Sequence, residues 1–273
     1  MSALEPLKIG IVGCAGRMGR MLVETVRGRA DCRVTAGSER PGSPALGQDI
    51  GRLAGQDPLG ITATDDPAAL FEASEAVLEF SSPAATVAHA RLAAATGRVH
   101  VIGTTGLGKD DEAAIAEAAR RAAIVLAPNM SLGVNLLLAL VRQAASRLGP
   151  DWDIDILEMH HRHKVDAPSG TALGLGRAAA AGRGVALDQV ARRTRDGQVG
   201  ARPAGEIGFA TLRGGDIVGD HLVVFAAEGE RLELGHRAAS RVIFARGAVH
   251  AALWARGKPP GLYRMADVLG LEG

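Results

Sequence analysis

The chain has 273 residues, 47% of them hydrophobic, and 31 basic against 30 acidic side chains, so it can form packed cores but lacks the charge of a general nucleic-acid binder. Cys14 and Cys32 are too few for a disulfide framework or a four-ligand zinc site, and neither a signal-peptide pattern nor an apolar run of about 20 residues is present. We therefore expect a cytoplasmic protein with no nucleic-acid or membrane partner and no structural metal.

The first half of the chain alternates short apolar runs with stretches of helical period, which predicts α/β architecture with a doubly wound parallel sheet, Rossmann-like in type. A Gly- and Pro-rich loop lies between Arg40 and Gly60. The expected strands are Lys8–Val12, Arg33–Gly37, Ile61–Thr64, Ala76–Phe80, Val99–Ile102 and Ile124–Leu126, and the expected helices are Arg17–Arg29, Ala84–Thr96 and Asp110–Arg121.

A glycine loop joins the first strand to the first helix. Its three glycines follow the spacing Gly-x-x-Gly-x-x-Gly, which departs from the more common Gly-x-Gly-x-x-Gly. Glycine permits a tight turn and close approach of the backbone to a pyrophosphate, and the helix start offers free N–H groups. The alternative is a purely structural turn. The candidate dinucleotide-binding residues in this loop are Gly13, Cys14, Ala15, Gly16, Arg17, Met18 and Gly19.

The second strand ends near Glu39, about 20 residues after the loop, where an acidic side chain binds the ribose 2′-hydroxyl of NAD. Arg40 and Arg17 are placed to bind the 2′-phosphate of NADP instead. We therefore expect NADH or NADPH to be accepted. Cys14 is interpreted as a small loop residue and not as a thiol catalyst.

Two further loops follow strands at the carboxyl edge of the sheet, where open α/β sheets bind ligands. Plain turns are the alternative for both. The residues assigned to the ribose and nicotinamide are Gly103, Thr104, Thr105, Ala127, Pro128, Asn129 and Met130.

The pattern changes near residue 130, which predicts a second, α+β domain. We expect a helix at Leu132–Arg147, another after Ser169-Gly170-Thr171, and a third at Ser240–Arg256. The expected strands are Asp153–His160, Glu206–Arg213, Asp216–Ala226 and Glu230–His236, with the last three forming an antiparallel meander. Periodicity leaves open whether residues 240–273 belong to the second domain or return to the first.

A cationic segment runs from His160 to Lys164 and is followed by Ser169-Gly170-Thr171 at a helix start. Cations and free helical N–H groups at one place suit a small dianion. If the segment is extended, period two places His160 and Lys164 on one face. The neighbouring cations should lower the pKa of His160 in the empty protein. A bound dicarboxylate should favour its protonated form. A solvated charged face and a metal site are the alternatives, but the neighbouring cations disfavour metal.

The cationic segment, the glycine loop, Gly103-Thr-Thr-Gly106 and the run from Ala127 to Asn135 resemble the 4-hydroxy-tetrahydrodipicolinate reductase family, long called dihydrodipicolinate reductase, over almost the whole chain. The resemblance implies NAD(P)H-dependent hydride transfer to a cyclic dicarboxylate in diaminopimelate and lysine biosynthesis. It further implies that His160 donates a proton and Lys164 assists it. The substrate-binding residues that it implies are His161, Ser169, Gly170, Thr171 and Arg241. Met130 departs from relatives that place an aromatic residue beside the nicotinamide.

The resemblance also gives a domain plan. It implies a dinucleotide-binding domain at 1–130, a domain for substrate binding and oligomerisation at 131–240, a tail at 241–273 that returns to the first domain, and a hinge between the domains. The open mixed sheet of the second domain is expected to form a homotetramer. Two other functions stay open: a dinucleotide-binding regulator without turnover, and a dehydrogenase of another amino-acid substrate.

Overall fold

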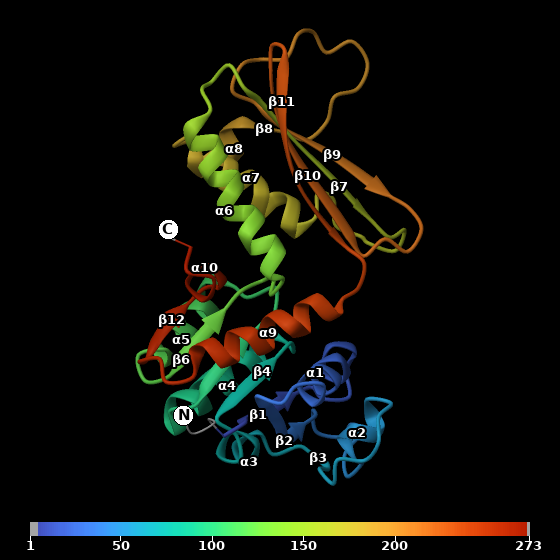
Figure 1. The fold of residues 1–273 in the computed structure, drawn as a ribbon, viewed down its shortest axis with the longest axis vertical. Helices are drawn as coiled ribbons and strands as arrows, with labels where there is room; N and C mark the ends of the chain where they lie inside the picture. Colours follow the sequence, from blue (N-terminus) through green and yellow to red (C-terminus); the bar gives the residue numbers. More distant parts are fainter. Residues whose placement is uncertain (1–4, 272–273) are drawn as a thin grey trace. The chain divides into compact units, whose positions relative to one another are not determined.

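A computed structural model describes residues 5–271, which divide into two compact units (Figure 1). Unit 1 takes its residues from Met1–Ser131 and Val242–Gly273, and unit 2 is Leu132–Arg241. Within residues 5–271, no helix has the length and apolar character needed to cross a bilayer.

Unit 1 is built on a seven-stranded parallel sheet in the order β12-β6-β5-β4-β1-β2-β3. Its strands are β1 (Leu7–Val12), β2 (Cys32–Ser38), β3 (Ala63–Thr64), β4 (Ala76–Glu79), β5 (Val99–Ile102), β6 (Ala123–Leu126) and β12 (Gly261–Tyr263). The central strands β4, β5 and β6 are buried along their whole length, as expected of strands covered on both faces. The predicted Rossmann-like parallel sheet is confirmed.

Helices cover both faces of this sheet. α1 (Arg17–Arg27) and α9 (Val242–Ala255) lie on one face, and α3 (Pro67–Glu72), α4 (Pro83–Thr96) and α5 (Lys109–Ala118) lie on the other (Figure 1). The short helices are α2 (Ile50–Leu53) and α10 (Met265–Val268). The C-terminal segment therefore packs in unit 1, where β12 pairs with β6.

Unit 2 is built on a mixed five-stranded sheet in the order β11-β10-β7-β9-β8. Its strands are β7 (Asp153–His160), β8 (Ala191–Arg192), β9 (Ile207–Arg213), β10 (Gly219–Ala227) and β11 (Glu230–Ala238), and its helices are α6 (Leu132–Arg147), α7 (Gly170–Gly182) and α8 (Leu187–Val190). The predicted open mixed sheet is confirmed.

The predicted meander of β9, β10 and β11 is wrong in one respect. β10 and β11 form an antiparallel hairpin, but β9 pairs with β7, and β7 separates it from β10. The connection at 214–218 is long enough to cross over one strand. Its backbone forms hydrogen bonds with the end of β7: the Gly214 N–H donates to the His160 carbonyl, and the His161 N–H donates to the Ile217 carbonyl. The glycine turn at 214–215 therefore marks a crossover and not a hairpin.

The core of unit 2 lies between one face of this sheet and the helices α6 and α7 (Figure 1). β7 contributes Ile154 and Ile156 to this core, while the alternate residue Leu157 stays 39% exposed. Period two along the strand produces this division between a covered and an uncovered face.

Candidate active site

The glycine loop of unit 1 has the backbone that a phosphate site requires. Gly13 has φ +67°, and a Cβ on Gly19 would lie 2.0 Å from the Gly13 carbonyl oxygen, so neither position accepts a side chain without strain. α1 begins after Gly16 without a side-chain cap and has no acidic residue in its first turn. Its first N–H groups and positive dipole end are therefore not neutralised by the helix's own side chains, which fits a pyrophosphate.

Glu39 lies beside this loop, where its Oε1 accepts a 2.8 Å hydrogen bond from the Ala15 N–H. Arg17 and Arg40 are exposed, and Met18 is half-buried. Cys14 is fully buried, and burial together with the Glu39 charge raises the pKa of its thiol to about 12. A thiol that stays protonated at neutral pH is a poor nucleophile, in agreement with its interpretation as a loop residue.

The two other predicted cofactor loops follow β5 and β6 at the same sheet edge. Gly103 and Thr104 are buried, whereas Thr105 is exposed. After β6, the Ala127 N–H donates to the Ile102 carbonyl, which ties this loop to the end of β5. Pro128 is exposed, Asn129 is half-buried and Met130 is 1% exposed.

In unit 2, the covered face of β7 changes from apolar to ionic at the end of the strand. Ile154 and Ile156 belong to the core, and the next two residues on that face are Glu158 and His160, which are 1% and 8% exposed. In the sheet register, Glu158 pairs with His221 of β10 and His160 pairs with Arg213 of β9. The crossover described above therefore brings a second histidine and an arginine to the pair.

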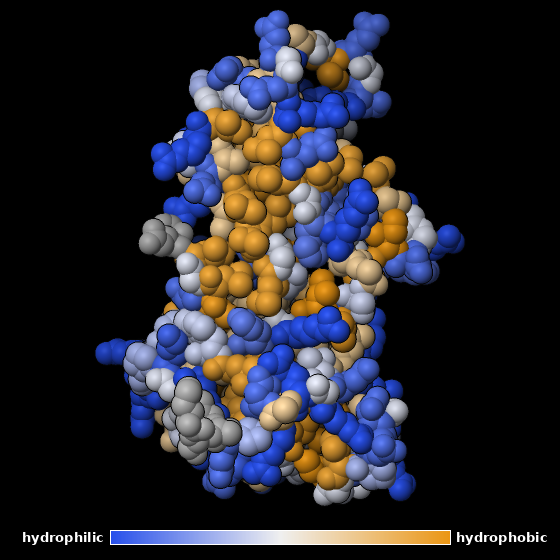
Figure 2. All heavy atoms as spheres, in the orientation of Figure 1, coloured by the Kyte–Doolittle hydropathy of each residue, from blue (hydrophilic) through white to orange (hydrophobic). Residues whose placement is uncertain are grey.

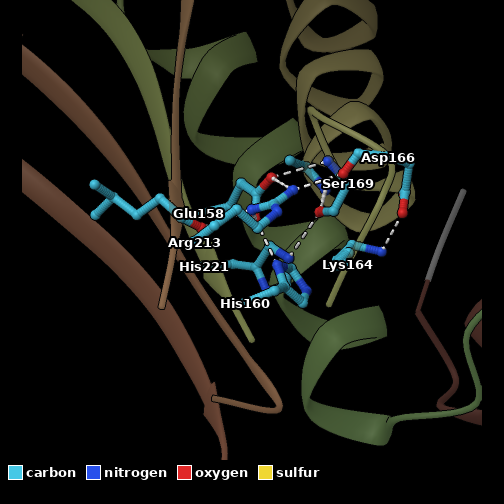
Figure 3. Close-up of polar contacts among 9 residues, drawn as sticks. Glu158, His160, Lys164, Asp166, Ser169, Arg213 and His221 are labelled. Carbon is cyan, nitrogen blue, oxygen red and sulfur yellow. Dashed lines mark hydrogen bonds and ion pairs between the residues drawn. The ribbon is translucent and has the colours of Figure 1, made fainter. Parts of the chain in front are cut away.

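Glu158 is the centre of this cluster (Figure 3). Its carboxylate accepts two 2.9 Å hydrogen bonds from Arg213, a 3.0 Å bond from the Ser169 N–H and a 2.5 Å bond from His160 Nδ1. Burial opposes ionisation, but these donors outweigh burial and hold the pKa of Glu158 below its usual range. Glu158 is therefore an ionised, buried carboxylate with a fixed orientation.

This carboxylate determines how His160 is oriented. Because Nδ1 donates to Glu158, Nε2 is the ring nitrogen left for proton exchange with another molecule. Burial lowers the pKa of His160, the hydrogen bond to Glu158 partly offsets this effect, and the charges of Lys164 and Arg213 lower it further. The predicted direction of the shift is confirmed, although burial, which the sequence did not reveal, is its largest cause.

His221 packs edge-on against His160, with ring centroids 5.0 Å apart. Its Nε2 lies 3.2 Å from Ser169 Oγ, and that oxygen also accepts the Ala172 N–H at the start of α7. Burial, followed by the charge of His160, lowers the pKa of His221 to about 4. His221 is therefore a neutral neighbour that braces the His160 ring and the start of α7.

The cationic segment is not extended beyond His160, so the expected alternation of side chains stops there. Residues 161–164 form a turn in which the Lys164 N–H donates to the His161 carbonyl. Lys164 Nζ lies 2.7 Å from Asp166 Oδ1, and this contact lowers the pKa of Asp166 (Figure 3). His160 and Lys164 still lie near each other, but they do not share a strand face. The turn at 161–164 positions Lys164, and the salt bridge to Asp166 holds its ammonium group.

The remaining predicted substrate residues are placed as follows. Gly170 is the exposed first residue of α7, with open space where a side chain would lie, and Thr171 follows it. His161 is half-buried. Ser169 is 1% exposed, and its hydroxyl and N–H both bind inside the protein. Arg241 is the last residue of unit 2, after β11, and makes none of the contacts that join the Glu158 cluster.

The sequence analysis assigned no role to four residues whose side chains make the contacts of this cluster: Glu158, Arg213, His221 and Asp166. Glu158 had a detectable signal, because it lies two positions before His160 and so shares its strand face. Arg213 and His221 had none, since only the sheet register brings them there. Within the described range 5–271, no three His, Cys, Asp or Glu side chains gather in a way that could hold a metal ion.

A parallel sheet with a glycine loop at its first βα turn, together with a separate unit that carries an oriented histidine, defines a two-unit dinucleotide-dependent oxidoreductase. Family models described as dihydrodipicolinate reductase, N-terminus, and dihydrodipicolinate reductase, C-terminus, match residues 7–130 and 133–269. The chain belongs to the dihydrodipicolinate reductase family.

Similar proteins agree with this assignment. The 4-hydroxy-tetrahydrodipicolinate reductase of Parvibaculum lavamentivorans is 60% identical over 267 residues, which cover 97% of this chain and 98% of the relative. The reductase of the same name from Dinoroseobacter shibae is 59% identical over 263 residues, covering 96% and 98%. Dipicolinate-bound dihydrodipicolinate reductase from Paenisporosarcina sp. shares the fold, with a TM-score of 0.75, 21% identity and coverage of 96% and 98%.

Proposed function

We propose that this chain catalyses the reaction after which its relatives are named, the NAD(P)H-dependent reduction of 4-hydroxy-tetrahydrodipicolinate. The substrate loses its 4-hydroxyl group as water, gains a hydride at C4 and a proton at C3, and becomes tetrahydrodipicolinate. This reaction belongs to diaminopimelate and lysine biosynthesis. The observation that carries the proposal is the Glu158–His160 pair beside the start of α7, in a chain about 60% identical to curated reductases.

In this proposal, unit 1 binds the dinucleotide. The glycine loop and the uncapped start of α1 bind the pyrophosphate, and Glu39 binds the ribose 2′-hydroxyl of NADH. The exposed Arg17 and Arg40 are available for the 2′-phosphate of NADPH, so we infer that both cofactors are accepted. When bound, the dihydronicotinamide supplies the hydride. The loops at Gly103–Thr105 and Ala127–Met130 hold its ribose and carboxamide.

Unit 2 binds the substrate and supplies the proton. One substrate carboxylate lies at the start of α7 near Gly170 and Thr171, where the helix dipole favours an anion. Lys164 neutralises the same carboxylate, and His161 and Arg241 bind the second one. The substrate's negative charge favours the imidazolium form of His160, so its Nε2–H can be donated to the ring carbon at C3 while Glu158 holds Nδ1.

We also infer that the chain assembles into a homotetramer through unit 2. Of the nine exposed large hydrophobic side chains among residues 5–271, all but Leu262 lie in unit 2. Figure 2 shows apolar side chains gathered over α6, where Leu136 and Leu140 are 44% and 40% exposed. The uncovered sheet face adds Leu157 and Leu212, which line a cavity of about 330 Å³. Exposed apolar area of this kind is typical of an interaction surface.

The buried free thiols Cys14 and Cys32 suit a reducing compartment, so we place the protein in the cytoplasm. The decisive experiment couples the purified protein to an aldolase-type synthase that makes the substrate and follows the oxidation of NADH and of NADPH separately. We expect oxidation of both cofactors that depends on the synthase. Oxidation of neither contradicts the proposal, and light scattering of the same sample measures whether the mass is that of a tetramer.

A further inference from the structure

A second buried carboxylate–histidine cluster lies in unit 1, at the end of β4. Glu79 is 0% exposed, and its carboxylate lies 2.7 Å from His100 Nε2 and 2.8 Å from His89 Nδ1. The Ser81 hydroxyl donates to the same carboxylate. The Phe71 ring of α3 lies nearly perpendicular to the His100 ring, with centroids 5.5 Å apart, and closes the cluster on the side of α3.

Burial of this carboxylate is costly. Burial disfavours the charged form, and the hydrogen bonds from His100 and His89 lower the pKa of Glu79 despite it. Buried ion pairs often contribute less to stability than an apolar group of the same volume. Val77, two residues earlier on the same face of β4, is such an apolar group and belongs to the core. Core packing alone therefore does not account for an ionic side chain at position 79.

The position of Glu79 provides an explanation, because it joins two loops at the carboxyl edge of the sheet. Its backbone carbonyl accepts the Gly103 N–H at 2.8 Å, and its side chain accepts from Ser81 in the loop after β4. The Ser81 N–H in turn donates to Thr104 Oγ1 at 3.1 Å. The carboxylate thus holds Ser81 in the loop after β4, and the Ser81 N–H connects that loop to the one that contains Thr104.

These two loops also pack closely against each other. A Cβ on Gly103 would lie 2.2 Å from the ring of Phe80, so the loop backbone lies directly on that ring. Thr86, from the first turn of α4, makes a 2.8 Å hydrogen bond to Thr104 Oγ1. Glu79 fixes Ser81, and Ser81 and Thr86 fix Thr104. Rotation of the Glu79 carboxylate would release the first of these contacts and loosen the second loop.

We propose that Glu79 is a positioning residue for the nicotinamide half of the cofactor: through Ser81 and Thr104 it holds the Gly103–Thr105 loop in the shape that binds the nicotinamide ribose. This inference rests on the proposed function for the cofactor's orientation in unit 1. The pyrophosphate and the adenosine ribose are assigned to the glycine loop and Glu39, and none of the side-chain hydrogen bonds described within residues 5–271 joins either of them to the Glu79 carboxylate.

The test compares a ligand with the nicotinamide half and a ligand without it. NADH carries both halves of the cofactor, whereas ADP lacks the nicotinamide ring and its ribose. For Glu79→Gln we expect the dissociation constant of NADH to rise about 3- to 30-fold, the range for residues that act on a ligand through others. The dissociation constant of ADP should stay within about twofold. A purely stabilising role would weaken both ligands equally or neither.

Glu75→Gln is the matched control. Glu75 immediately precedes β4 at the opposite edge of the sheet, where it binds the Lys8 N–H and Arg256, and its substitution should leave the affinity for both ligands unchanged. If Glu79→Gln does not fold, Ser81→Ala replaces it, because Ser81 is exposed and its hydroxyl forms one link of the same chain of hydrogen bonds. The same difference between NADH and ADP is expected.

Equal weakening of NADH and ADP, or unchanged binding of NADH, overturns the inference for whichever variant folds. Fluorescence titration of the wild-type protein with NADH separates this result from the proposed function. A wild-type protein that binds NADH but does not reduce the substrate contradicts the proposed reaction and leaves the comparison of the two ligands valid.

Discussion

The two buried carboxylate–histidine clusters share a design and differ in access. Glu79 and Glu158 both lie on a central strand, near its carboxyl end, and both accept hydrogen bonds from histidine. Glu79 has two histidines and a serine as donors, and its His100 side chain is 0% exposed. Glu158 has Arg213 as a bidentate donor, and its His160 side chain keeps 10% exposure.

The difference shows what an arginine contributes to such a cluster. In unit 2 the guanidinium supplies a permanent positive charge for Glu158, so His160 is not needed as its counter-ion and is free to change protonation. In unit 1 the histidines themselves are the principal donors to the carboxylate. A buried glutamate with histidine partners therefore stabilises loop structure in unit 1, whereas in unit 2 the same combination is suited to proton transfer.

The comparison is tested most strongly at His160. His160→Ala should lower turnover about 10²- to 10⁴-fold, the usual contribution of a positioned general acid, while NADH affinity stays nearly unchanged. Steady-state kinetics and NADH titration measure the two effects. His163→Ala, an exposed residue three positions later, is the control and should retain its turnover. Near-wild-type turnover of His160→Ala would remove His160 from its proposed role.

A smaller loss is expected when only the orientation of His160 is disturbed. Glu158→Gln keeps the size of the side chain but removes the charge that fixes Nδ1–H and binds Arg213. We expect kcat to fall about 10- to 100-fold, comparable to the loss of an outer partner of an active-site histidine, with little change in the KM for NADH. A fall in NADH affinity without a fall in kcat would assign to Glu158 the role that we give to Glu79.

The pH dependence of stability should also reflect the unit 2 cluster. The folded pKa of His221 is about 4, below the ordinary value of 6.5, so the unfolded chain binds the proton more readily. Stability is therefore full above pH 6.5 and is lost as the pH falls toward 4, by roughly 3 kcal/mol at most. The lowered pKa of His160 acts in the same direction.

Urea unfolding at pH 7 and pH 4.5 measures this loss. His221→Gln should have a smaller difference in unfolding free energy between the two pH values, because Gln does not titrate. Substitution of the exposed His163 by Gln is the control and should retain the wild-type difference. If both variants keep it, the low pKa of His221 is not what makes the protein acid-sensitive.

Glu39 offers the mildest test, because this carboxylate faces a loop and not a histidine. Glu39→Ala should weaken NADH more than NADPH, by about tenfold, since the ribose hydroxyl bond belongs only to NADH. Glu39→Gln separates two effects, as an amide oxygen can still accept the Ala15 N–H while the charge is lost. Equal losses for NADH and NADPH would contradict the ribose assignment.

Much of the fold could be predicted because local patterns determine it. The alternation from Asp153 to His160 placed β7 with its correct bounds, and the glycine loop placed the start of α1. α3 was missed, although Asp66 caps it and Pro67 opens it, because six residues are too short for a clear helical period. The three-residue strand β12 was missed for a similar reason.

The sequence indicated only those residues of the proposed site that adjoin in the chain. His160, Lys164 and Gly170 were proposed because they belong to one segment. Arg213 lies 55 residues from Glu158, and its role depends on β9 pairing with β7. Turn residues indicate where a chain reverses but not which strand it will pair with, so the incorrect meander concealed both Arg213 and His221.

The crossover of residues 214–218 has a consequence for how the protein acquires its active form. Until β9 has paired with β7, Glu158 has no arginine partner, and a buried carboxylate without one is strongly unfavourable. A contact between residues so distant along the chain carries a loop-closure cost that local contacts avoid. The orientation of His160 through Glu158 therefore depends on completion of the unit 2 sheet, and a chain without the β7–β9 pairing lacks the arginine that holds Glu158.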